Sequence, residues 1–246
     1  IKNIIMKNVC LIGYGYWGKI IHKSLREINS IKKIFIIKGR KTKSNINFNN
    51  IDWVIITANT NNHFKLVKKY LNLKINVFCE KPLTLKFKDD LELYKIAKRN
   101  NCKIYVSDVE NYKNKRLSIL KNNLIYRSKF SDFKKDIIYR LAYHEFTYLF
   151  KYFNSLSNIQ IKDIESSEGL LKFNLQNNNK IFSFSYDLNK RKKKHKFNNI
   201  NLISKKNVLK VMLSNVINEK ANFSENKRIS LFAQSMCLKV LKKLKA

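Results

Sequence analysis

The chain has 246 residues, of which 44% are hydrophobic and 12% aromatic, enough for one or two folded domains and too apolar for a disordered tail. Its formal net charge of +34 points at first to an anionic partner such as nucleic acid. The cations are spread along the chain, however, because residues 1–112 carry 22 Lys and Arg against 8 Asp and Glu, and residues 113–246 carry 29 against 9. We therefore expect a basic solvated surface, with no nucleic acid and no membrane as partner.

The spacing of the cysteines and the hydropathy pattern indicate whether the protein binds a metal and in which compartment it is expected. Cys10, Cys79, Cys102 and Cys237 stand at no spacing typical of metal ligands, so we expect free thiols and no metal. No stretch approaches the roughly 18 apolar residues that cross a membrane, and no signal-peptide core precedes the first apolar run. These features predict a cytoplasmic protein.

The first half alternates short apolar runs with helical patterns, from Asn8 to about Tyr112. This alternation is typical of parallel strands joined by crossover helices, so it predicts a doubly wound α/β sheet. The expected strands are 9–13, 33–37, 52–57, 75–79 and 103–107, and the expected helices are 17–28, 62–71 and 88–100.

After Tyr112 the rhythm changes, and strand patterns follow one another closely. Asn177-Asn178-Asn179 indicates a hairpin, since Asn tolerates the left-handed backbone of tight turns. We expect a smaller α+β domain with a largely antiparallel open sheet. Its expected strands are 159–168, 170–175, 180–188, 196–204 and 208–213, followed by a helix over 228–244.

A glycine motif stands at the end of the first strand. Gly13-Tyr14-Gly15-Tyr16-Trp17-Gly18 fits G-x-G-x-x-G, with a strand before it and a helix after it. Gly13 would allow the tight turn, Gly15 the approach of a pyrophosphate, and Gly18 the close packing of helix and strand. Three of the five glycines of the chain fall in this pattern, so we favour a dinucleotide site over a bare structural turn.

The end of the second strand bears on the choice of cofactor. An acidic residue is expected there if the ribose hydroxyl of NAD is recognised, but Lys38, Gly39, Arg40 and Lys41 occupy the place. Cations suit the 2′-phosphate of NADP, although enrichment of the chain in Lys could produce the same pattern. The cofactor is predicted to be NAD or NADP, with NADP favoured.

Two further motifs follow strands whose carboxyl ends should meet the cofactor, namely Thr57-Ala58-Asn59-Thr60-Asn61-Asn62-His63 and Glu80-Lys81-Pro82. Pro82 is the single proline of the chain, so we expect it to fix a backbone shape beside Lys81, a cis bond being one form; a simple strand stop is the alternative. With the glycine motif, these segments resemble the Gfo/Idh/MocA (glucose-fructose oxidoreductase/inositol dehydrogenase) family. The opening GYGYWGK resembles members that act on sugars or nucleotide sugars in surface-polysaccharide biosynthesis.

The resemblance implies an NAD(P)-dependent dehydrogenase or reductase acting on the CH-OH group of a sugar, cyclitol or nucleotide sugar. It implies that Lys81 contacts the reacting hydroxyl and that His144, in the stretch 139–146, exchanges the proton. Members usually carry an aspartate four residues before that histidine and another three after it, where this chain has Arg140 and Thr147. On a helix, Arg140 would share a face with His144 and could pair with an anionic substrate group.

These departures, together with a short second domain, keep a second hypothesis open: a member that has lost catalysis and serves as a cofactor-binding or interaction subunit. We expect two domains, a Rossmann domain over 1–112 and a substrate and oligomerisation domain over 113–246, with self-association through the open sheet. The run Lys190 to Lys196 is expected to be a solvated hairpin. The expected catalytic residues are Lys81 and His144, and the expected cofactor-binding residues are Gly13, Gly15, Tyr16, Trp17, Gly18, Lys38, Arg40, Thr57, Asn59, His63, Glu80 and Lys81.

Overall fold

The structure is a computed structural model that describes residues 5–39, 46–113, 115–132, 134, 136–153, 158–204 and 207–245. The chain divides into two compact units, the first formed by residues 1–112 with 207–231 and the second by residues 113–206 with 232–246. This division differs from the predicted domains in one respect, because residues 207–231 return to the first unit.

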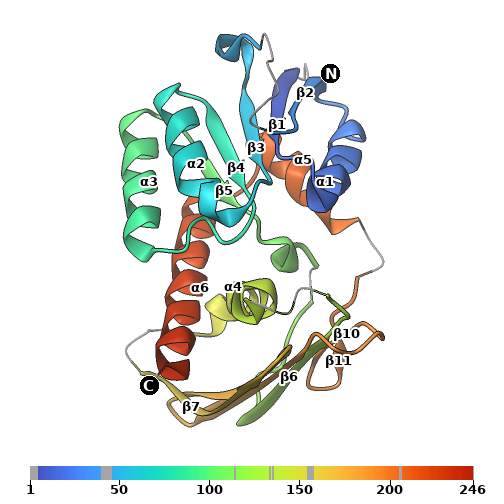
Figure 1. Cartoon of the computed structure of the whole chain (residues 1–246), viewed down its shortest axis with the longest axis vertical. Coiled ribbons are helices and arrows are strands. Elements are labelled where there is room, and N and C mark those ends of the chain that lie inside the picture. Colours follow the sequence, from blue (N-terminus) through green and yellow to red (C-terminus); the bar gives the residue numbers. More distant parts are fainter. Residues whose placement is uncertain are drawn as a thin grey trace. The chain divides into compact units, whose positions relative to one another are not determined.

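The first unit is built on a parallel sheet of five strands in the order β2-β1-β3-β4-β5 (Figure 1). The strands are β1 (Lys7–Ile12), β2 (Ile31–Ile37), β3 (Trp53–Ile56), β4 (Asn76–Cys79) and β5 (Ile104–Val106). The helices are α1 (Tyr16–Arg26), α2 (His63–Asn72), α3 (Phe87–Arg99) and α5 (Val208–Ile217), with short 3-10 turns η1 (Phe48–Asn50), η2 (Thr60–Asn62) and η3 (Val109–Lys113).

Helices cover both faces of this sheet. On one face, Val54 and Val77 pack with apolar residues of α2 and α3, such as Val67 and Leu93. On the other face, the alternate residues of the same strands pack with α1 and α5, which Figure 1 shows opposite α2 and α3. All four residues of β3 are buried, as expected for an inner strand of a parallel sheet. The predicted doubly wound Rossmann-type fold is therefore confirmed.

The expected strand over 208–213 is wrong, because α5 occupies this segment. Its buried residues are spaced as on one face of a helix, and Asn207 caps it by accepting a hydrogen bond from Lys210 N at 3.1 Å. The run of Val, Leu and Met favoured a strand, while the spacing and the cap were the better signals. The buried residues are Leu209, Met212, Leu213, Val216 and Ile217.

The second unit is built on a mixed sheet of six strands in the order β11-β10-β6-β9-β8-β7. Neighbouring strands of this sheet pair antiparallel, except for β6 and β9, which pair parallel to each other. The strands are β6 (Asn122–Ser128), β7 (Ile159–Ser167), β8 (Leu170–Asn177), β9 (Lys180–Asp187), β10 (Lys194–Phe197) and β11 (Ile200–Asn201). Its helical segments are the π-helical turn η4 (Ile138–Ala142), α4 (Tyr143–Leu149), η5 (Phe150–Tyr152) and the later part of α6 (Phe223–Leu244).

Aromatic side chains form much of the core of the second unit. Phe146 of α4 packs on Phe173 and Phe184, whose rings stack with centroids 4.6 Å apart. The hairpin predicted at Asn177 to Asn179 joins β8 to β9, and Asn178 has a φ of 54°. The largely antiparallel second sheet is thus confirmed.

Two details of this sheet were predicted wrongly. The expected strand over 196–204 consists of β10 and β11, which pair as a hairpin turning at Asn198, whose φ is 49°. The run Lys190 to Lys196 is also not solvated throughout, since His195 in β10 is 2% exposed. No helix within the described part of the chain is long and apolar enough to cross a bilayer.

Candidate cofactor and substrate site

The turn after β1 is held by hydrogen bonds to residues at the ends of both neighbouring strands. Gly13 N donates to Ile37 O at 2.9 Å, and Thr57 Oγ1 donates to Gly13 O at 2.7 Å. Gly13 has a φ of +94°, and an added Cβ would lie 2.8 Å from Ala58 N. This position therefore requires glycine for its backbone shape and for its close contact with the loop after β3.

The other two glycines of the motif differ in their surroundings. A Cβ on Gly18 would lie 2.3 Å from Gly13 O, so Gly18 permits the close packing of α1 on the turn. A Cβ on Gly15 would meet no atom within 4 Å. Gly15 precedes α1, which has no side-chain cap and no acidic residue in its first turn. The first amide groups of α1 can therefore bind an anion beside Gly15.

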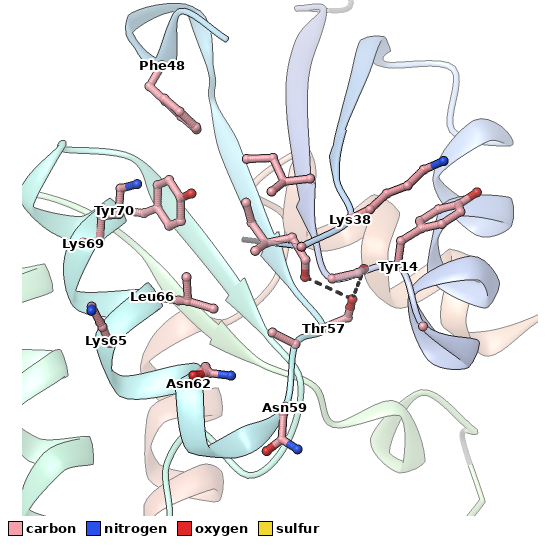
Figure 2. Close-up of a pocket in the computed structure, with 16 residues that line it drawn as sticks. Tyr14, Lys38, Phe48, Thr57, Asn59, Asn62, Lys65, Leu66, Lys69 and Tyr70 are labelled. Carbon is pink, nitrogen blue, oxygen red and sulfur yellow. Dashed lines mark hydrogen bonds between the residues drawn. The ribbon is translucent and has the colours of Figure 1, made fainter. Parts of the chain in front are cut away.

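A cavity of about 1150 Å³ opens at this turn, above the carboxyl ends of β1, β2 and β3 (Figure 2). Of the predicted cofactor residues, Gly13, Gly15, Lys38, Thr57 and Asn59 line it. An open space of this size beside a glycine and a helix N-terminus fits a dinucleotide.

One wall of the cavity was missed in the sequence. Figure 2 shows that α2 presents Lys65, Leu66, Lys69 and Tyr70 to the cavity, and Phe48 lies beyond them. The residues of α2 recur at the spacing of one helix face, which was a usable signal, whereas nothing in the sequence marked Phe48. The lining residues outside the predicted cofactor set are Ile12, Tyr14, Ile37, Gly39, Phe48, Ala58, Asn62, Lys65, Leu66, Lys69 and Tyr70.

Among the described residues, the lining contains three lysines and no acidic residue. Lys69 Nζ lies 5.8 Å from the Phe48 ring centroid and 5.3 Å from that of Tyr70, and these two rings are 5.3 Å apart. Burial raises the pKa of Tyr70 to about 12, so its hydroxyl is neutral. Lys38 Nζ lies 5.6 Å from the Tyr14 ring centroid on the other side of the cavity. The cavity thus offers aromatic surfaces and positive charge.

The loop after β4 carries the Glu-Lys-Pro motif, and the Lys81–Pro82 peptide bond is cis. Glu80 is buried, and its Oε2 accepts from Lys81 N at 3.3 Å. Its Oε1 has no hydrogen-bond partner among the described residues. A buried carboxylate oxygen without a partner is costly, and this oxygen is closed to solvent in the structure.

His63 joins the loops after β3 and β4. Its Nδ1 lies 2.9 Å from Pro82 O and its Nε2 lies 3.0 Å from Ala58 O. Cys79 Sγ is 3.4 Å from the same Nδ1. His63 is 1% exposed and is not part of the cavity lining, so in this structure it positions the loop that carries Lys81.

The remaining predicted cofactor residues are placed differently. Tyr16 and Trp17, on the first turn of α1, are 83% and 38% exposed and do not line the cavity. Arg40 lies outside the described residues. Glu80 and Lys81 lie at the end of β4, outside the lining of this cavity.

In the second unit, His144 is half-buried at the start of α4, directly after the π-helical turn η4. Thr147 Oγ1 donates to His144 O at 2.7 Å, so this threonine contacts the backbone of the histidine. Arg140 belongs to the π-helical turn, and its Nη2 donates to Ser131 Oγ at 2.9 Å. Such turns recur at functional sites because they displace side chains from regular helical positions.

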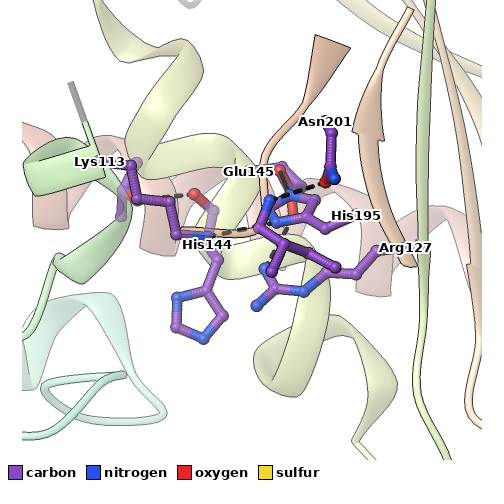
Figure 3. Close-up of polar contacts among 8 residues, drawn as sticks. Lys113, Arg127, His144, Glu145, His195 and Asn201 are labelled. Carbon is purple, nitrogen blue, oxygen red and sulfur yellow. Dashed lines mark hydrogen bonds and ion pairs between the residues drawn. The ribbon is translucent and has the colours of Figure 1, made fainter. Parts of the chain in front are cut away.

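A buried charged network adjoins His144 (Figure 3). Glu145 accepts from Arg127 Nη1 at 2.9 Å and contacts His195 Nε2 at 3.0 Å. Burial opposes ionisation of Glu145, but its interactions with His195 and Arg127 outweigh this effect and lower its pKa to about 2. Lys113 Nζ lies 3.4 Å from His195 Nδ1. No sequence pattern indicated this network, because its members meet only through the sheet.

One family model and several solved structures match this chain. Residues 40–108 match the model of the Gfo/Idh/MocA family, described as an oxidoreductase family with an NAD-binding Rossmann fold. The resemblance to the Gfo/Idh/MocA family is confirmed. The matched residues lie within the first unit, and no curated protein matches this chain.

Solved structures share the fold at low identity. UDP-N-acetylglucosamine 3-dehydrogenase from Acidithiobacillus ferrooxidans has a TM-score of 0.80 at 12% identity, over 96% of this chain and 97% of its own. The WlbA dehydrogenase from Thermus thermophilus, in complex with NAD and UDP-GlcNAcA, has a TM-score of 0.71 at 12% identity, over 94% and 95%. A myo-inositol dehydrogenase from Corynebacterium glutamicum has a TM-score of 0.69 at 12% identity, over 97% of each chain. At this identity the likeness shows the fold that Gfo/Idh/MocA dehydrogenases share.

Proposed function

We propose that this protein is an NAD(P)-dependent oxidoreductase that moves a hydride between the nicotinamide and a secondary hydroxyl or ketone of a sugar-like substrate. The observation that carries the proposal is the cavity at the Gly13 turn, which combines an open Gly15, a helix N-terminus and, as far as its lining is described, lysines without any acidic residue. The nucleotide-sugar and inositol dehydrogenases that share the fold support the substrate class.

The residues present fit a dinucleotide. The amides of α1 and the uncrowded Gly15 would hold the pyrophosphate, and the wall of Phe48, Leu66 and Tyr70 offers apolar surface to the adenine. When bound, the cofactor supplies the hydride acceptor or donor.

Lys81 and His144 are the residues that we expect to act on the substrate during the reaction. The Lys81 ammonium would stabilise the negative charge that develops on the reacting oxygen, and the buried clamp of His63 on Pro82 holds its loop in place. His144 would exchange the proton of the hydroxyl, a role that contributes about 10²–10⁴-fold to such reactions.

We further propose that NADP(H) binds at least as tightly as NAD(H). Lys38 lies at the end of β2 and lines the cavity. In NAD-binding proteins, an acidic residue at this place accepts hydrogen bonds from the ribose hydroxyls. Lys38→Ala should weaken NADPH binding and leave NADH binding almost unchanged, as measured by fluorescence titration. A clear preference of the unaltered protein for NADH would contradict this part of the proposal.

The catalytic proposal is tested with a panel of sugars, cyclitols and nucleotide sugars, by following NAD(P)H absorbance. Lys81→Ala and His144→Ala should each lower kcat by at least about 10²-fold while the cofactor dissociation constant changes less than about threefold. Arg140 and Thr147, in place of the usual aspartates, support one alternative, a cofactor-binding subunit without catalysis. Tight cofactor binding with no turnover across the panel would favour that alternative.

A further inference from the structure

A group of cations lies at the end of β6 in the second unit. In the pairing of β6 with β10, Arg127 lies opposite His195 and Ser128 opposite Lys194. Lys129 and Lys193 follow directly beyond this last pair, and their charges interact. Arg140 reaches the same place through its hydrogen bond to Ser131, two residues beyond Lys129. We call Arg127, Lys129, Arg140 and Lys193 the cationic cluster.

The acidic residues near this place are engaged with other groups. Glu145 bonds to both Arg127 and His195, and Asp187, whose main-chain oxygen accepts from Lys129 N, forms an ion pair with Lys190. Lys129 is half-buried, and its burial together with the charges of Arg127, Arg140 and Lys193 lowers its pKa to about 8. Within the described ranges, neither Lys129 nor Lys193 forms an ion pair. The cluster therefore holds an excess of positive charge.

Enrichment of the chain in lysine explains exposed cations, but it does not explain this arrangement. A solvated lysine costs little, whereas a half-buried lysine among three other cations raises the free energy of the folded protein. Clusters of this kind are typical of binding sites, where a ligand of opposite charge compensates the repulsion. An anion at the cationic cluster would do so.

We propose that the cationic cluster binds a phosphate group carried by the substrate. Lys129, Lys193 and Arg140 together carry more positive charge than one carboxylate could neutralise. A phosphate monoester, with a charge of roughly −1.5 to −2, neutralises more of it. Arginine and lysine side chains with a serine hydroxyl are also common phosphate donors. The assignment to the substrate rests on the proposed function, because Arg140 precedes the proposed proton-exchanging His144 by four residues in the same unit.

The test uses inorganic phosphate as the probe on the full chain, with calorimetric titration at constant ionic strength. Lys129→Met keeps the length of the side chain and should weaken phosphate binding by about tenfold or more. Lys194→Ala is the matched control, because it removes an exposed cation next to Lys193 in the chain, and it should change binding less than about twofold. Equal losses in both variants, or no binding by the unaltered protein, would overturn the proposal.

A stability measurement separates binding from folding. Without phosphate, Lys129→Met should unfold at the same temperature as the unaltered protein or at a higher one, because it removes a repelled cation. With phosphate, the midpoint of the unaltered protein should rise and that of the variant should not. If Lys129→Met does not fold, Lys193→Ala replaces it with the same expected loss of binding.

A third measurement addresses the source of the phosphate. With phosphorylated sugars as substrates, Lys129→Met should raise KM at least about tenfold and leave NAD(P)H affinity unchanged. Phosphate binding that depends on Lys129 while turnover does not would contradict the assignment to the substrate. If the protein binds no NAD(P)H, the proposed function fails, and the phosphate titration still decides whether the cationic cluster is an anion site.

Discussion

His63 shows how one side chain can hold two functional loops. Its ring bridges Pro82 O and Ala58 O, which belong to the loops after β4 and β3. The sequence motif predicted a cofactor contact for this residue, because spacing alone cannot tell a side chain that faces a ligand from one that turns inward. Thr57 and Asn59 of the same motif line the cavity.

Replacement of His63 by leucine should destabilise the protein. The variant retains a side chain of similar size but has no ring N–H to donate to Pro82 O or Ala58 O, and a buried carbonyl without a donor costs about 1–3 kcal/mol. We expect the free energy of unfolding to fall by about 2 kcal/mol or more, measured by urea titration. Asn61→Ala, on the exposed turn just before it, is the control and should change stability by less than about 0.5 kcal/mol. Similar small losses in both variants would contradict the clamp.

At the scale of elements, local spacing was enough to predict some parts of the fold and insufficient for others. The turn around Gly13 and the hairpin at Asn178 depend on backbone shapes that few residues adopt, so they were visible in the sequence. The burial of His195 depends on its cross-strand partner Arg127 and on Glu145. Contacts of this kind join residues far apart in the chain and leave no periodic pattern.

Helix α3 carries a carboxyl group whose protonation is linked to stability. Asp90 is 2% exposed, and burial raises its pKa from 3.8 to about 7, although hydrogen bonds from Thr84 oppose the change. Between these two pH values the folded protein retains this proton and the unfolded chain loses it, so the free energy of unfolding falls as the pH rises. Such a difference in pKa between the folded and unfolded states corresponds to a loss of up to about 4 kcal/mol.

Asp90→Asn should remove this pH-dependent fall in the free energy of unfolding. We expect the variant to be more stable than the unaltered protein at pH 8, and its free energy of unfolding to depend less on pH between 4 and 7, as measured by urea titrations at several pH values. Asp89→Asn removes a carboxylate from the same helical turn and is the control for a change in charge. An identical pH dependence in Asp90→Asn and the unaltered protein would refute the linkage.

At the scale of the whole molecule, we propose that the protein self-associates through the second sheet. The core of the second unit takes alternate residues of β6, β8 and β9, and the residues between them face away from it. Leu124 is 64% exposed and Ile181 is 37% exposed on that outward face. Apolar residues on an exposed sheet face are typical of contact surfaces.

Leu124→Lys should weaken this association. The added charge would be buried at the contact, so we expect the dissociation constant of the oligomer to rise at least about tenfold, measured by sedimentation velocity. Leu73→Lys changes a leucine of similar exposure (49%) at the end of α2 and should leave the association unchanged. A monomeric unaltered protein at micromolar concentration would contradict the proposal.

A titration with NADH and NADPH decides whether the turn around Gly13 binds a nicotinamide dinucleotide. Because a side chain at Gly15 meets no protein atom, Gly15→Val should fold with nearly the same unfolding midpoint, whereas Gly18→Ala should unfold more easily. We expect saturable binding by the unaltered protein and at least a hundredfold weaker binding by Gly15→Val, because its side chain takes the place of the pyrophosphate. Equal affinity of the unaltered protein and Gly15→Val for the dinucleotide would contradict binding of the pyrophosphate at this turn.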